Sequence, residues 1–130
     1  MDPYQEFYER VTNIHRLAAL QGHLGWDQEV LMPAKGGEAR GEMMAWLAGQ
    51  RHEALTHERM GELLEALETA SLDADQRANV REMRRAYDQA VQLPKAFVEA
   101  FAQARSRRWS LGSKREQPRI FLPSSLPYRN

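Results

Sequence analysis

The sequence predicts an all-α protein of four to five amphipathic helices in antiparallel hairpins, followed by an irregular C-terminal tail. Two observations predict this fold. Apolar residues recur at steps of three or four along most of the chain, which places them on one face of a helix. Prolines, glycines and helix-capping residues divide these periodic segments into pieces as long as single helices. At 130 residues, the chain has the length of one domain.

The first helix is expected over residues 3 to about 22, because Pro3 suits the first helical position. Gly22 and Gly25 weaken a helix near its end. We therefore expect a connection over residues 26–37, which contain a proline and two further glycines. The apolar stripe of this helix consists of Tyr4, Phe7, Val11, Ile14, Leu17 and Leu20.

Two further helices should follow this connection. The first is expected from about Glu38 to His52 or beyond. Thr56 can cap a shorter helix that comes after it. The apolar residues are Ala39, Met43, Trp46 and Leu47 in the first of these helices and Met60, Leu63, Leu64 and Leu67 in the second.

A capping box marks the start of the fourth helix. Asp73 is followed three positions later by Gln76, and in this pattern each side chain bonds to the backbone N–H of the other residue. The helix should end before Pro94, because the residue that precedes a proline disfavours the helical conformation. Pro94 in turn opens a fifth helix. The apolar residues are Val80, Met83, Tyr87 and Val91 in the fourth helix and Phe97, Val98 and Phe101 in the fifth.

The helical pattern is lost after about Ser106. Residues 105–108 include three arginines, and residues 118–127 include three prolines, which are incompatible with a helix. We therefore divide the chain into a helical segment over residues 1–106 and an irregular tail over residues 107–130. A shift of reading frame near codons 105 to 110 would explain this change, and reading the gene in its other two frames would test that hypothesis.

Composition excludes several classes of function. Lysine plus arginine equal aspartate plus glutamate at 18 each, so the basic excess of a typical nucleic-acid-binding domain is missing. The chain has no cysteine, which excludes disulfides, cysteine-ligated zinc and thiol catalysis. No apolar run approaches the roughly 20 residues needed to span a membrane, and the first residues do not resemble a secretion signal. We expect a cytoplasmic protein with neither nucleic acid nor membrane as a partner.

Two groups of residues contain potential metal ligands. His52 and His57 stand five positions apart, which leaves their side chains roughly 140° apart on a helix, too far for one ion. We expect both to be solvated histidines. His23, Asp27 and Glu29 are too few for a zinc site on an irregular connection, and we expect them to hold that connection through capping and hydrogen bonds. No metal ligand and no catalytic residue is therefore predicted in this chain.

One run of residues carries a family resemblance. Leu24-Gly25-Trp26-Asp27-Gln28-Glu29 is followed by Met32-Pro33 and by Glu38-Ala39-Arg40. With these residues the chain resembles the thermostable metallocarboxypeptidase (carboxypeptidase Taq) family over residues 4 to 106, about the first fifth of the family's usual length. We expect a structural role for the signature residues, which are Gly25, Trp26, Asp27, Gln28, Glu29, Met32 and Pro33.

The resemblance implies an all-helical enzyme that releases C-terminal amino acids from peptides. It implies zinc, or a similar divalent metal, on a His-Glu-x-x-His helix, where the ion activates a water and the glutamate takes its proton. That motif lies far downstream of the matching region, so His52 and Glu53 are not the family's catalytic pair. The chain is therefore expected to be an inactive N-terminal part of such an enzyme, which would bind peptide substrate only at full length.

The alternative is a helical module that works alone in protein interaction or dimerisation. In either case we expect self-association, because apolar faces that would pack against later helices in a full-length relative should face water here. A stable, monodisperse complex of the short chain would favour the alternative.

Overall fold

The computed structural model describes residues 1–30 and 36–112, which form five helices and no strand. These helices are α1 (Pro3–Val30), α2 (Gly37–Thr56), α3 (Glu58–Glu68), α4 (Ala74–Ala90) and α5 (Lys95–Gly112). The predicted all-α class is confirmed. None of the described helices combines the length and the apolar character needed to cross a membrane.

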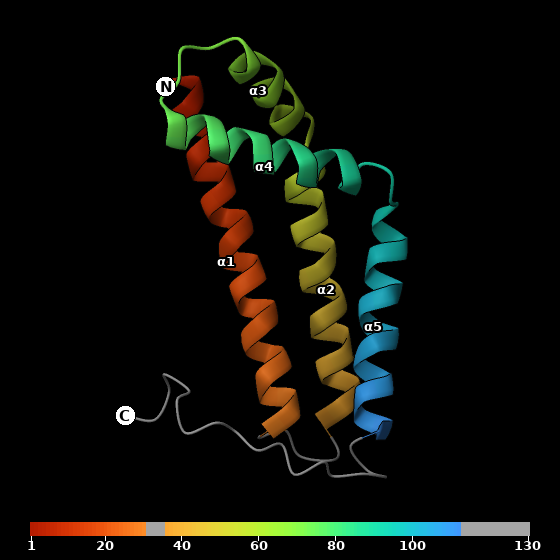
Figure 1. The fold of residues 1–130 in the computed structure, drawn as a ribbon. Coiled ribbons are helices and arrows are strands. Elements are labelled where there is room, and N and C mark those ends of the chain that lie inside the picture. The colour runs from red at the N-terminus through yellow and green to blue at the C-terminus, as the bar shows by residue number, and fades with distance from the viewer. Residues whose placement is uncertain (31–35, 113–130) are drawn as a thin grey trace, which may run out of the picture.

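Three long helices run side by side with α2 between α1 and α5 (Figure 1). Successive long helices run in opposite directions, as the predicted antiparallel hairpins require. The shorter α3 and α4 lie at one end of this layer, where α4 crosses the ends of α1 and α2. The opposite end holds the last turn of α1, the first turn of α2 and the last turn of α5.

The apolar core lies where α3 and α4 meet the N-terminal half of α1. Four residues of α3 are at most 3 % exposed, so this short helix is buried along a whole face. Burial of one such side chain contributes about 1.5–3 kcal/mol to the free energy of unfolding. The core consists of Phe7, Ile14, Met60, Leu63, Leu64, Leu67, Val80 and Met83. It confirms the whole predicted stripe of α3. The predicted stripes of α1 and α4 are confirmed only in part, because Leu20 and Val91 are 52 % and 48 % exposed.

The first helix is longer than predicted. α1 continues through Gly22 and Gly25 to Val30, so the expected connection over residues 26–37 is wrong for residues 26–30. A helical glycine costs about 1 kcal/mol relative to alanine, and contacts that the last turns of α1 make with α2 and α5 offset this cost. Residues 31–35, which include Met32 and Pro33, lie outside the described part of the chain.

Helix α3 is capped by a different residue from the one predicted. Thr56 belongs to α2, where its Oγ1 donates to the carbonyl of His52 at 2.8 Å. His57 is the N-cap, because its Nδ1 accepts the backbone N–H of Arg59 at 3.0 Å. The capping box of α4 is confirmed, with both of its reciprocal hydrogen bonds present.

Helix α2 buries a face other than the predicted one. Trp46 is 62 % exposed and Met43 is 45 % exposed, although Leu47 is buried as expected. The buried face carries small residues, among them Gly41, Ala48 and Gly49, which let α5 approach closely. A Cβ atom on Gly49 would lie 2.6 Å from Oε1 of Glu99, so no larger residue fits without movement of that side chain.

The fifth helix also departs from its prediction. It continues to Gly112 rather than ending near Ser106, so the predicted irregular tail is wrong for residues 107–112. Phe97 and Phe101 are 53 % and 61 % exposed, and their rings stack with centroids 6.3 Å apart. Residues 113–130 lie outside the described part of the chain.

Candidate functional site

The signature run forms the last turns of α1 and joins that helix to its two neighbours. Asp27 accepts a hydrogen bond from Nη2 of Arg40 at 2.5 Å, and Nη1 of Arg40 donates to the carbonyl of Leu24 at 2.8 Å. The Arg40 side chain is only 14 % exposed. One guanidinium therefore joins the end of α1 to the start of α2.

Gln28 makes the corresponding contact with α5. Its Nε2 donates to the carbonyl of Ser106 at 3.0 Å and contacts the Ser106 hydroxyl at 2.8 Å. The two residues are 8 % and 5 % exposed, although they stand 78 positions apart in the sequence. A buried hydrogen bond of this kind is costly to leave unmade, so it fixes the position of α5 against α1.

The other described signature residues differ in their exposure. Trp26 is partly buried, and its ring lies 6.3 Å from the ring of His23. Gly25 has no atom within 4 Å of the position of an added Cβ. Glu29 is exposed. The signature thus contains two residues that bond to other helices, Asp27 and Gln28, two that are partly buried and one that is exposed.

A groove of about 840 Å³ lies between α1, α2 and α5, on the side to which Gly25 and Trp26 turn. Its lining includes apolar residues of α5, small residues of α1, and arginines of α2 and α5. Sequence reasoning missed this groove, because it depends on how three helices pack. The lining residues include Gly22, Gly25, Ala48, Phe101, Arg51 and Arg105.

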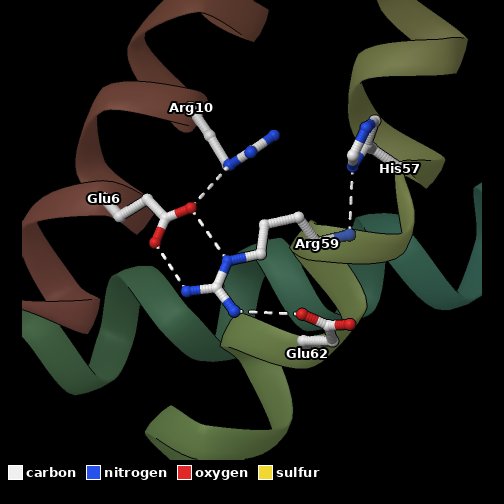
Figure 2. Close-up of polar contacts among 5 residues, drawn as sticks. All are labelled: Glu6, Arg10, His57, Arg59 and Glu62. Carbon is white, nitrogen blue, oxygen red and sulfur yellow. Dashed lines mark hydrogen bonds and ion pairs between the residues drawn. The ribbon is translucent and has the colours of Figure 1, made fainter.

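A second polar cluster lies at the opposite end of α1 (Figure 2). Glu6 accepts two hydrogen bonds from Arg59, to Oε2 at 2.7 Å and to Oε1 at 2.9 Å, and Arg10 adds a third at 3.4 Å. The hydrogen bond with Arg59 lowers the pKa of Glu6 to about 2. Glu6 and Glu62 in turn raise the pKa of Arg59 above its usual value. This cluster ties α1 to α3 and leaves no carboxylate oxygen of Glu6 without a contact.

The residues weighed as metal ligands do not come together. His52 is buried at 9 % exposure, so the expectation that it is solvated is wrong, whereas His57 is exposed and caps α3. His52 and Gly49 are both among the buried residues of α2. Neither residue belonged to the apolar face that was predicted for this helix. No group of three or more histidine, cysteine, aspartate or glutamate residues in the described ranges could hold a metal ion. Among the described residues, Asp27 is already bonded to Arg40, and the remaining candidates do not supply the three or four ligands that a zinc site needs.

Comparison with known proteins gives a family. The family model described as carboxypeptidase Taq (M32) metallopeptidase matches residues 6–124. Thermostable carboxypeptidase 1 of Thermus thermophilus is 37 % identical over 92 % of this chain. The chain spans only 25 % of that relative's length. No solved structure matches the chain.

The family match runs past residue 106, where we expected the resemblance to end. It therefore covers the signature residues, α1 from Glu6 onward, the other four helices and part of the sequence after them. The chain belongs to the carboxypeptidase Taq (M32) metallopeptidase family.

Proposed function

We propose that this chain is the N-terminal helical part of a metallocarboxypeptidase whose whole polypeptide releases C-terminal amino acids from peptides. Family membership and the 37 % identity to a carboxypeptidase support this proposal. The ion, zinc or a similar divalent metal, would be held by residues beyond this quarter of the polypeptide. It would supply a polarised carbonyl and an activated water.

The role of this part would be to form a rigid helical wall rather than to perform chemistry. The observation that carries this proposal is the ion pair between Asp27 and Arg40. The acidic group at the centre of the signature is used to join two helices, and the neighbouring Gln28 is used to join a third. Polar groups that are already bonded within the fold are poorly placed to bind an ion or a substrate.

The purified chain tests the proposal directly. We expect no tight stoichiometric zinc site in a calorimetric titration at pH 7, because three correctly placed donors are required. We also expect no release of C-terminal amino acids from peptides with any added divalent metal, under conditions in which the Thermus thermophilus enzyme serves as positive control. Metal-dependent hydrolysis by the pure chain that Glu53→Gln abolishes would contradict the proposal and would give His52 and Glu53 a catalytic role.

The alternative of an independent interaction module has one supporting observation. Trp46, Phe97 and Phe101 are each more than half exposed, and large aromatic side chains are common where proteins meet. Self-association of the chain is therefore a second proposal, compatible with the first. A monodisperse complex of the chain alone, found together with an absence of any catalytic remainder in the gene, would favour this alternative.

A further inference from the structure

The groove between α1, α2 and α5 contains two glycines that the described fold does not explain. Gly22 and Gly25 lie within α1 with helical backbone angles, and neither has positive φ. An added Cβ at either position would meet no atom within 4 Å, in contrast to Gly49. Glycine is one of the poorest residues for a helix interior, and its usual justification is a close approach of other atoms to the backbone. In the described part of the chain nothing makes that approach.

The walls of the groove suit the apolar face of a helix. On α1 the lining combines the small residues Ala18, Gly22 and Gly25 with larger ones such as Trp26. Val98 and Phe101 line the groove from α5. Ala48 of α2 lies between them. Phe101 is 61 % exposed although it lines this groove, so the surface is apolar and uncovered by the described residues.

The groove has an excess of positive charge, which favours an acidic occupant. Arg51, Arg105 and Arg108 line it, whereas Glu29 is the acidic residue of the lining. Among residues 1–30 and 36–112 these three arginines have no ion-pair partner. An occupant with carboxylates beside its apolar face would therefore complement the groove.

We propose that the groove is the docking surface for an amphipathic helix with acidic residues, contributed by the part of the family polypeptide beyond the matched quarter. The length of the relative supports this choice, because three quarters of it lie outside the match of 25 %. A second copy of this chain fits less well. A two-fold interface brings the same patch of each copy together, so the three arginines of one groove would face those of the other.

This inference rests on family membership and deepens the proposed structural role, but it does not depend on catalytic activity. Its test uses the full chain and overlapping peptides of about 25 residues that tile the unmatched part of the Thermus thermophilus carboxypeptidase, a length that forms several helical turns. Fluorescence anisotropy measures the binding of each labelled peptide. We expect the bound peptides to be amphipathic and acidic, and binding to weaken at least about tenfold in Gly25→Leu, which corresponds to about 1.4 kcal/mol.

Two further variants separate docking from folding. Arg105→Glu changes only the charge of the groove, so it should weaken the acidic peptides and leave the circular dichroism spectrum unchanged. Arg85→Glu is the matched control, because Arg85 is an exposed arginine of α4, outside the groove. It should bind the acidic peptides as the unaltered chain does.

Several results would overturn the inference. They are the absence of any bound peptide, bound peptides that are basic, and acidic peptides that Gly25→Leu and Arg105→Glu bind as well as the unaltered chain does. A dimer of the chain that Gly25→Leu dissociates would show instead that a second copy occupies the groove. These binding results do not depend on hydrolytic activity. The proposed enzyme function is therefore tested separately, by the peptide hydrolysis assay.

Discussion

Glu6 and Arg59 stand 53 positions apart in the sequence and meet through two nearly parallel hydrogen bonds, at 2.7 Å and 2.9 Å (Figure 2). This paired geometry fixes the direction of both side chains as well as their separation. It holds α3 against the first turns of α1, beside the buried Phe7. The contact therefore acts together with the apolar core.

The first prediction is that acid weakens the fold through Glu6. Its pKa is lowered from 4.5 to about 2 in the folded chain, so the ion pair contributes its full stability above pH 4.5 and loses it as the pH falls toward 2. Thermal denaturation between these pH values should show a smaller decline for Glu6→Gln than for the unaltered chain. Glu9→Gln, an exposed change on the same helix, is the control and should follow the unaltered chain. Equal declines in all three would contradict this role.

The second prediction contrasts two glycines. Gly22→Ala should raise the free energy of unfolding by roughly 0.5–1 kcal/mol, because alanine is the better helix former and the added Cβ meets open space. Gly49→Ala should give a smaller gain or a loss, because its Cβ would lie 2.6 Å from Oε1 of Glu99. Urea denaturation of both variants measures the difference. If the two changes stabilise equally, α5 does not approach α2 as closely as described.

The third prediction concerns the contact between Gln28 and Ser106. Ser106→Ala removes a buried hydroxyl from the Gln28 amide and should lower the free energy of unfolding by about 0.5–1.5 kcal/mol. Ser71→Ala, at an exposed serine, should change it by less than about 0.5 kcal/mol. Chemical denaturation of both variants decides the matter, and an indistinguishable pair would mean that α5 is not held at this point.

The fourth prediction is that the chain self-associates through the exposed face of α2. Trp46 is 62 % exposed and Met43, on the same face, is 45 % exposed. Trp46→Ser should therefore weaken association, whereas Tyr8→Ser, which removes another exposed aromatic ring from α1, should not. Light scattering over a concentration series measures both. A monodisperse monomer of the unaltered chain at the highest concentration would refute the prediction.

The parts of the fold that sequence reasoning predicted are those set by local chemistry. The stripe of leucines in α3 and the capping box of α4 depend on residues within two turns of each other, and both are present as expected. The face of α2 was not predictable in this way. Apolar residues that recur every three or four positions indicate which side chains share a face of a helix. They do not indicate that α5 will pack against the face of α2 that carries its glycines and alanine.

The candidate site was predicted only in part. The signature located Asp27 and Gln28, but their partners Arg40 and Ser106 are brought to them by packing and carry no local signal. The pair of Glu6 and Arg59 was missed for the same reason. The groove is a property of three helices together, so no single segment indicates it.

The uneven placement of the core has a consequence for how the protein opens. Leucines and a phenylalanine hold the end where α3 and α4 lie, whereas the opposite end depends on Asp27 with Arg40 and on Gln28 with Ser106. Local opening requires less free energy where few apolar contacts are broken. Amide hydrogens in the last turns of α1 and α5 should therefore exchange with deuterium well before those near Phe7. Protection should rise along α1 and α2 toward the end that α3 and α4 cover (Figure 1).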